Sequence, residues 1–85
     1  MADIDIFLSS GLDDFNRFEW PTRFVRCPDV GEIIQSRPYA KSNGVRVVEL
    51  RVVTVVHCYD GSVCLDLHLK SGYTMEWWES MKPWK

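Results

Sequence analysis

Cysteine, glycine and proline are all scarce in this chain of 85 residues, which has three, five and four of them. An odd number of cysteines, without the dense and even spacing of a disulfide framework, argues against a small secreted scaffold. It fits a protein of a reducing compartment, where thiols stay free. With 46% hydrophobic and 26% charged residues, the composition is that of one small globular domain.

Long hydrophobic runs and a signal peptide are also missing. No segment approaches the ~18 consecutive apolar residues that a membrane span needs. The opening residues MADIDIFLSS carry acids where a signal peptide needs bases. No catalytic or cofactor motif rises above background, so we expect a cytoplasmic protein that is not an enzyme. We expect no cofactor, no membrane contact and no small-molecule substrate.

Aromatic residues, by contrast, are abundant, with four Trp, four Phe and three Tyr. Large aromatics give a small core the most burial per residue, and some also suit a binding face. The net charge of −2 argues against a generic nucleic-acid binder. Residues 1–19 carry five acids and one base, whereas residues 20–58 carry six bases and three acids. The acidic leader would dock on the basic middle or attract a partner, unless these charges are simply scattered over a solvated surface.

Strand patterns dominate the sequence, and helix patterns are nearly absent. The stretch DIDIFLSS alternates apolar with acidic residues and predicts a strand at residues 3–9, before a short helical turn that Ser10 would cap. Pro21 lacks an N–H donor, which confines the next segment to an edge strand or an irregular arm. We expect a short strand at residues 32–35 and then a polar loop with the turn pair Asn43 and Gly44.

The valine-rich run VRVVELRVVTVVHC, residues 45–58, is apolar on both faces. At the usual rise it would span ~45 Å, which is too long for one flat strand in so small a domain. We expect either one strongly bent strand or two strands joined at a kink near residues 49–51 and shared between packed sheets. Small barrels solve the same problem in this way.

A hairpin is expected around Asp60 and Gly61, in one of two registers. A three-residue loop that starts at Tyr59 gives four pairs: Val53 with Leu67, Thr54 with Asp66, Val55 with Leu65, and His57 with Val63. A two-residue turn would instead place His57 opposite Cys64. We prefer the first register, because it separates polar from apolar side chains better.

A second hairpin is expected at Lys70, Ser71 and Gly72, with Gly72 in the left-handed region. It gives three pairs: Leu69 with Tyr73, Leu67 with Met75, and Leu65 with Trp77. Trp78 would then point away from the core. Residues 79–82 would make one helical turn that Pro83 stops, which leaves Trp84 free to pack on the barrel mouth.

The order of the motifs DVGEIIQ, VVTVVHCYDG and SVCLDLHL resembles that of short bacterial and phage proteins with an SH3-like small barrel. In those proteins a VG-x-I strand precedes a V-x-x-V-x-H strand that ends in an Asp-Gly hairpin. The resemblance covers residues 30–69. It implies a small barrel and a setting on phages or other mobile elements, and it implies no activity. The aromatic leader and the tail YTMEWWESMKPW depart from the pattern, so a role particular to this protein would lie there.

Four residues near the first hairpin are of metal-ligating types: His57, Cys58, Cys64 and His68. Their spacing is unlike that of a zinc ribbon or finger, and Cys64 would lie ~13 Å from His68 along one strand. A nucleophilic pair of His57 with Cys64 needs the less favoured register and has no group to orient the imidazole. We therefore expect small core cysteines and a satisfied histidine, with neither a metal site nor a catalytic site.

Two kinds of binding surface fit the charges and aromatics. A nucleic-acid groove would combine stacking platforms at Tyr39 or Trp20 with a basic patch. That patch would consist of Arg23, Arg26, Arg37, Lys41, Arg46 and Arg51. A protein interface would instead use exposed Trp and Tyr beside Arg. The candidate partner-binding residues are Trp20, Arg23, Arg26, Arg37, Tyr39, Trp78 and Trp84. For each Trp, closure of the protein's own barrel mouth is the alternative, and the Arg stems would then cover apolar surface.

We predict an all-β, SH3-like small barrel of five to six strands. Residues 1–19 would form an acidic N-terminal extension, residues 20–78 the barrel, and residues 79–85 a short C-terminal helical turn. The predicted function is a non-enzymatic protein-interaction module, an accessory of a phage or mobile element that binds and modulates a host protein. Self-association as a homodimer, through an exposed strand edge at residues 3–9 or 32–35, is a special case. The alternatives are a nucleic-acid-binding small barrel and a structural piece of a virion or larger assembly.

Overall fold

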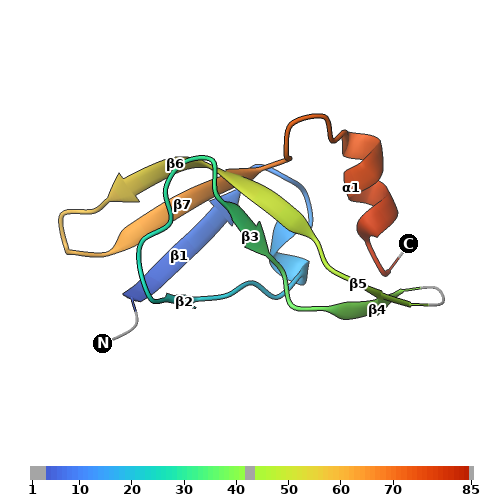
Figure 1. The fold of residues 1–85 in the computed structure, drawn as a ribbon, viewed down its shortest axis with the longest axis horizontal. Coiled ribbons are helices and arrows are strands. Elements are labelled where there is room, and N and C mark those ends of the chain that lie inside the picture. The colour runs from blue at the N-terminus through green and yellow to red at the C-terminus, as the bar shows by residue number, and fades with distance from the viewer. Residues whose placement is uncertain (1–3, 42–43, 85) are drawn as a thin grey trace.

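The computed structural model describes residues 4–41 and 44–84, and strands dominate it. The strands are β1 (Ile4–Ser10), β2 (Arg23–Phe24), β3 (Ile33–Gln35), β4 (Tyr39–Lys41), β5 (Gly44–Arg46), β6 (Glu49–His57) and β7 (Val63–His68). Five of them form one sheet in the order β2-β1-β7-β6-β3, and β4 and β5 form a separate ribbon. Figure 1 shows the sheet curled into a half-barrel, with the helix α1 (Met75–Met81) and the β4–β5 ribbon at one end and the β6–β7 turn at the other. Over its described residues the protein is a small β protein with one short helix, and it has seven strands instead of five to six.

Strand β1 lies inside the sheet. It pairs in parallel with β7 from Ile6 to Ser10, and its first residues pair antiparallel with β2. The predicted alternation is confirmed, because Ile6 is buried and Phe7 is exposed; Asp3 lies outside the described residues. The segment expected as an N-terminal extension therefore supplies an internal strand. Of the two edges considered for self-association, only the one at β3 ends the order of strands in this sheet.

The segment after β1 departs from the predicted capped helix. The Ser10 hydroxyl accepts a hydrogen bond from the backbone N–H of Leu12 at 3.1 Å, so it stabilises a tight turn. The helical turn lies further on, as the 3-10 turn η1 (Phe15–Arg17). After Pro21 the chain forms only the two-residue edge strand β2, as the missing N–H predicted.

The β6–β7 hairpin has the predicted three-residue turn. Three predicted pairs are confirmed: Thr54 with Asp66, Val55 with Leu65, and His57 with Val63. Gly61 has a φ of 90°, the left-handed conformation that such a loop needs. The predicted pair of Val53 with Leu67 is wrong, because a bulge at Val53 leaves Val52 opposite Leu67. This extra residue explains why the apolar residues of the run do not alternate.

The valine-rich run is divided between two strands, which was one of the two predicted alternatives. β5 ends at Arg46 and β6 begins at Glu49, so the break lies before the predicted kink. β5 pairs with β4 in a small ribbon, and Gly44 of the predicted turn pair lies opposite Lys41 in it. Asn43 of the predicted turn pair lies outside the described residues.

The predicted second hairpin is wrong, because residues 75–81 form α1 instead of a strand. Thr74 is the N-cap, and its hydroxyl accepts a hydrogen bond from the backbone N–H of Trp77 at 3.3 Å. Gly72 keeps the predicted left-handed conformation, with a φ of 85°. The helix contains most of the turn predicted at residues 79–82 and ends before Pro83 as expected, but it begins four residues earlier.

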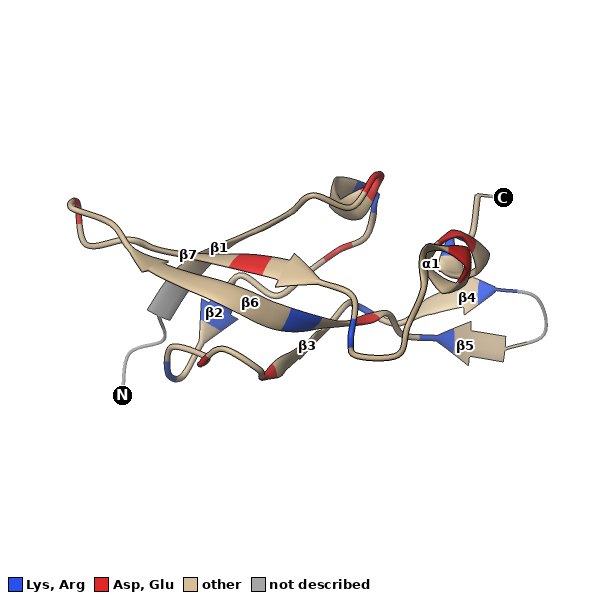
Figure 2. Ribbon diagram, turned by 90° about the horizontal axis from the view of Figure 1, so that it is seen from above, with Lys and Arg blue, Asp and Glu red and all other residues tan. Residues whose placement is uncertain are grey.

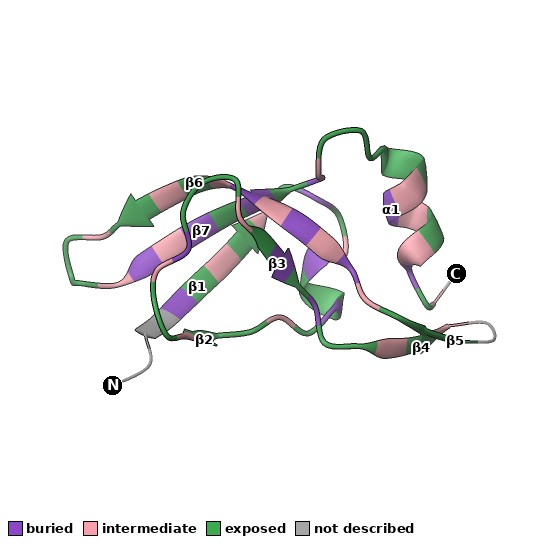
Figure 3. Ribbon diagram, viewed as in Figure 1, coloured by how far each residue is buried: buried purple, intermediate pink, exposed green. Residues whose placement is uncertain are grey.

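Helix α1 turns Trp78 into the core, so the prediction that Trp78 points outward is wrong. Its side chain is fully buried, and its indole Nε1–H donates to the backbone oxygen of Asp13 at 2.9 Å. In the predicted strand, Trp77 faced the core and Trp78 faced away from it, because successive strand residues point to opposite faces. Successive helix residues do not point to opposite faces, so Trp78 can face the core in α1. Phe18 packs between two indoles, with ring centroids 5.3 Å from Trp78 and 5.1 Å from Trp84. Figure 3 shows the buried position on α1 beside the alternating buried positions of β1, β6 and β7.

A cluster of charges around Lys82 fixes the end of α1 to the turn after β1. The Lys82 side chain is fully buried, and its Nζ lies 2.6 Å from Asp13, 3.1 Å from Asp14 and 2.7 Å from Glu79. Burial alone would lower the pKa of Lys82, but the hydrogen bonds to Asp13, Glu79 and Asp14 outweigh it and raise that pKa. The hydrogen bond from Lys82 likewise holds the pKa of Asp13 below its usual value. Figure 2 shows the acidic positions on α1 and beside η1 that face each other here.

Candidate functional site

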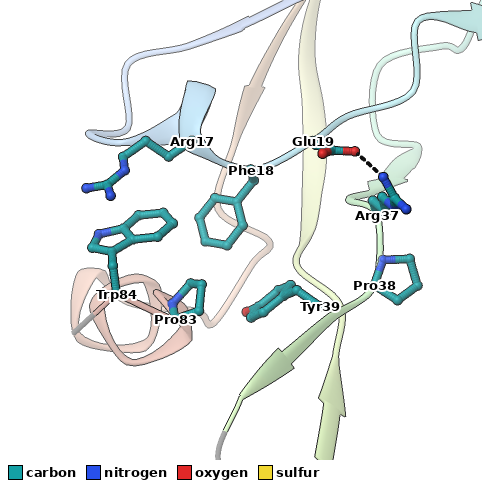
Figure 4. Close-up of a pocket in the computed structure, with 8 residues that line it drawn as sticks. All are labelled: Arg17, Phe18, Glu19, Arg37, Pro38, Tyr39, Pro83 and Trp84. Carbon is teal, nitrogen blue, oxygen red and sulfur yellow. Dashed lines mark hydrogen bonds and ion pairs between the residues drawn. The ribbon is translucent and has the colours of Figure 1, made fainter.

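Three of the candidate partner-binding residues, Arg37, Tyr39 and Trp84, line one cavity of about 320 Å³. We call it the aromatic pocket. Its full lining is Arg17, Phe18, Glu19, Arg37, Pro38, Tyr39, Pro83 and Trp84. Figure 4 shows the rings of Phe18, Tyr39 and Trp84 around the cavity, with the two arginines at its rim.

Three segments far apart in the sequence build the aromatic pocket: the end of η1, the entry to β4, and the residues that follow α1. Two hydrogen bonds hold the second and third together. The Tyr39 hydroxyl donates to the backbone oxygen of Met81 at 2.5 Å, and the Lys41 ammonium group donates to that of Lys82 at 2.5 Å. Burial raises the pKa of Tyr39, so its phenol stays neutral and keeps this hydrogen bond at physiological pH.

The two arginines at the rim are held differently. The Arg37 guanidinium lies 2.9 Å from the Glu19 carboxylate, and both side chains are largely exposed. This hydrogen bond raises the pKa of Arg37, but an exposed ion pair costs little to open. The Arg17 guanidinium instead stacks 4.0 Å above the ring centroid of Trp84. No carboxylate within residues 4–41 and 44–84 lies at ion-pair distance from Arg17.

The Trp84 indole carries a hydrogen-bond donor without a partner. Its Nε1 is buried and meets no acceptor in the part of the chain that the structure describes. A buried donor of this kind costs free energy, and native structures usually satisfy it. Figure 4 shows that this nitrogen lies on the side of the ring nearest Arg17.

The other four candidates lie elsewhere. Trp20 packs on Phe15 with ring centroids 4.8 Å apart, and its Nε1–H donates to the Phe15 backbone oxygen at 2.9 Å. Trp78 is in the core. Arg23 is in β2, and Arg26 forms an ion pair with Glu32, so neither lines the aromatic pocket.

Sequence reasoning missed two central residues of the aromatic pocket, Arg17 and Phe18. Both fall within the segment expected as an acidic extension, so the pattern gave no reason to place them beside Tyr39. The stretch RFEW, in which a base stands directly before two closely spaced aromatics, was the available signal.

A second opening follows the free edge of the half-barrel between β2 and β3. Two clefts there share the lining residues Phe24, Ile33 and Ile34. Ile33 is partly exposed, as are other apolar residues nearby such as Val25. At one end, the hydrogen bond from Arg26 and a second from the backbone of residue 29 lower the pKa of Glu32 to about 2. This edge includes residues 32–35, one of the two segments considered for self-association.

The expectation of neither a metal site nor a catalytic site stays a prediction. In the described ranges no group of three or more His, Cys, Asp and Glu side chains is placed to hold a metal ion. Cys64 lies opposite Val56, so it is not opposite His57 as the less favoured register required. The described helix is too short to cross a membrane.

Comparison of the chain with protein-family models, with curated proteins and with solved structures finds no match. The aromatic pocket and the free edge are therefore the two features of the structure that bear on its function.

Proposed function

We propose that the protein is a non-enzymatic interaction module that binds an extended, acidic peptide segment of another protein in the aromatic pocket. The observation that carries this proposal is the Arg17–Trp84 stack. It combines a guanidinium without a carboxylate partner in the described residues and an indole N–H without an acceptor there. Aromatic rings beside arginine are typical of the few residues that dominate interface energetics.

The peptide chemistry follows from these groups. An acidic side chain would draw Arg17 off the indole and form a charge-assisted hydrogen bond. The uncovered Trp84 Nε1–H would then donate to a backbone carbonyl of the peptide, as polar groups do in grooves that recognise extended, proline-rich segments. An apolar or proline side chain would pack against Phe18 and Tyr39. A second acid would compete with Glu19 for Arg37.

We also propose that the fold is an SH3-like barrel and that the protein is an accessory of a phage or mobile element that modulates a host protein. In its support, β3, β6 and β7 follow one another as antiparallel neighbours and correspond to the three motifs that resemble those proteins. Five of the eight residues that line the aromatic pocket lie in the leader and tail, which depart from that pattern, and the other three, residues 37–39, lie within it. We therefore propose that the leader and tail supply the role that is particular to this protein.

Nucleic acid is the second candidate, since an Arg–Trp platform also stacks bases. Two observations count against it. Arg26 and Arg37 are already paired with carboxylates. The net charge of −2 disfavours a nucleic acid, which carries a charge on every phosphate, more than it disfavours a short peptide with one or two acidic side chains. Binding to a labelled oligothymidine that falls steeply with salt would favour this candidate.

Self-association through β3 is compatible with the first proposal and rests on a separate observation. The hydrogen bonds of Glu32 and Ser36 point toward β6, so the backbone groups of Ile33 and Gln35 point to the free edge. A second copy related by a two-fold axis would place its Gln35 opposite Ile33 and satisfy both. The variant Gln35→Pro removes the outward backbone N–H and also the side-chain amide that donates to Glu49 at 2.8 Å. We expect it to abolish a dimer seen by light scattering, and we expect Gln35→Ala, which loses only the side-chain bond, to keep the dimer.

The peptide proposal is tested by selecting a random peptide display library on the immobilised full chain. We expect enriched peptides to be acidic and to bind the variant Arg17→Ala with at least ~10-fold lower affinity, since loss of a charge-assisted contact costs ~1.5–3 kcal/mol. Arg26→Ala is the matched control, because it removes an exposed arginine outside the pocket. Peptides that bind both variants equally, or that carry no acids, would reject the aromatic pocket as the site.

A further inference from the structure

Two cysteines face each other at the tip of the β6–β7 hairpin. The Sγ atoms of Cys58 and Cys64 lie 3.7 Å apart, and both residues are partly exposed. The third cysteine, Cys27, is outside this hairpin, and its thiol donates to the backbone oxygen of Pro28 at 3.5 Å. Figure 1 and Figure 2 place the hairpin tip at the opposite end of the molecule from α1. The cysteine pair is therefore separate from the aromatic pocket.

The turn holds the two cysteines on a well-ordered frame. The backbone N–H of Cys58 donates to the oxygen of Ser62 at 2.8 Å, and that of Gly61 donates to the oxygen of Cys58 at 3.0 Å. The Asp60 carboxylate accepts from the backbone N–H and the hydroxyl of Ser62 at 2.9 Å and 2.6 Å. A disulfide has a sulfur–sulfur distance of ~2.05 Å, so the two sulfurs need to close by roughly 1.7 Å. Cys58 lies opposite Ser62 and Cys64 lies opposite Val56, so the two cysteines are diagonal neighbours. Closure of the bond therefore combines rotation of these partly exposed side chains with a small backbone movement at the hairpin tip.

The two thiols are not equivalent. The hydrogen bond with Cys58 and, after it, burial raise the pKa of Cys64. Since the thiolate is the nucleophile in disulfide exchange, a raised pKa suits Cys64 to the second, resolving step, which leaves the first attack to Cys58.

We propose that Cys58 and Cys64 form a reversible thiol–disulfide site that reacts with small disulfides of the glutathione type. The Cys58 thiolate attacks one sulfur of glutathione disulfide, which forms a mixed disulfide and releases one glutathione thiolate. Cys64 then loses its proton to water and attacks the Cys58 sulfur, which releases the second glutathione. Two protein thiols and one glutathione disulfide thus become one protein disulfide and two glutathiones.

The disulfide would close a small ring around the turn that carries Tyr59. The Tyr59 side chain is fully exposed. Oxidation would therefore cross-link the two strands on either side of an exposed aromatic residue, and reduction would release this link. This gives the hairpin tip two states set by the ratio of glutathione to its disulfide.

The test treats the reduced full chain with glutathione disulfide and counts the free thiols by alkylation and intact mass. We expect two of the three thiols to disappear, with no glutathione retained and full recovery after dithiothreitol. Cleavage before Asp60 separates the two cysteines in sequence, so a linked pair of fragments identifies the bond. Cys27→Ser is the matched control and should form the same link.

The variant Cys64→Ser separates the two steps. We expect it to keep one glutathione on Cys58, because the resolving thiol is missing. A wild-type protein that retains glutathione, keeps all three thiols or forms a link through Cys27 would overturn the proposal. Circular dichroism of each variant checks that the hairpin still folds, and this conservative change leaves both strands otherwise unaltered.

Discussion

Replacement of Trp78 by alanine is the change that separates the observed fold most sharply from the hairpin expected at residues 65–78. In the structure Trp78 is fully buried and donates its indole N–H to Asp13. In the expected hairpin it would be exposed, and its loss would change the free energy of unfolding by no more than ~0.5 kcal/mol.

The structure gives a much larger cost. Truncation of a buried Trp to Ala costs ~3–5 kcal/mol through lost burial and the cavity left behind. The lost hydrogen bond to Asp13 adds ~0.5–1.5 kcal/mol. A domain of this size is stable by only ~4–13 kcal/mol at the usual value per residue, so Trp78→Ala should remove a large part of the total.

The assay is urea unfolding followed by far-ultraviolet circular dichroism, which does not depend on the Trp residues for its signal as fluorescence does. Trp77→Ala is the matched control, because Trp77 is the neighbouring residue on α1 and is only partly buried. We expect Trp77→Ala to cost less than half as much. Equal and small effects of the two substitutions would refute the burial of Trp78 and the helix that produces it.

Three further predictions concern the Lys82 cluster, the ion pair at the free edge, and the hairpin turn. Lys82→Met should lower the urea midpoint more than Asp14→Asn, because it leaves three carboxylates facing one another without their ammonium group. The pKa of Glu32 is about 2 in the folded protein against an ordinary 4.5. The stabilising effect of its carboxylate is therefore complete above pH 4.5 and is lost as the pH falls toward 2. The urea midpoints of wild type and Glu32→Gln should converge as the pH falls through this range. Gly61→Ala should destabilise by ~1–2 kcal/mol, because an alanine is strained at a φ of 90°, and a smaller cost would contradict the left-handed turn.

The parts of the fold that local chemistry determines were predictable. An Asp-Gly turn and the separation of polar from apolar side chains determined the register of the β6–β7 hairpin at His57 and Val63. The strand at β1 followed from its alternation. The bulge at Val53 was not predictable, because both faces of that run are apolar and neither register is penalised.

The parts that depend on distant contacts were not predictable. β1 pairs in parallel with β7, more than fifty residues later, and no local pattern specifies such a partner. The stretch after Gly72 fits both the two-residue period of a strand and the 3.6-residue period of a helix, since Met75, Trp77 and Trp78 suit a half-buried strand or a short helix. The hydrogen bonds from Trp78 and Lys82 to Asp13 decide for the helix, and those partners come from the other end of the chain. Distant contacts also assemble the aromatic pocket, through the hydrogen bonds from Tyr39 and Lys41 to the end of α1 and the residue after it. The sequence therefore could not show that Arg17 lies beside Trp84.

The peptide proposal is tested most directly by the indole N–H signals in a ¹⁵N-correlated spectrum, followed during titration with an enriched acidic peptide. Trp20 and Trp78 already donate to backbone oxygens, whereas the Trp84 donor has no acceptor in the described residues. We expect the Trp84 indole signal to move downfield in proportion to bound peptide, while the signals of Trp20 and Trp78 stay in place. A titration that shifts other indole signals and leaves that of Trp84 unchanged would contradict binding in the aromatic pocket.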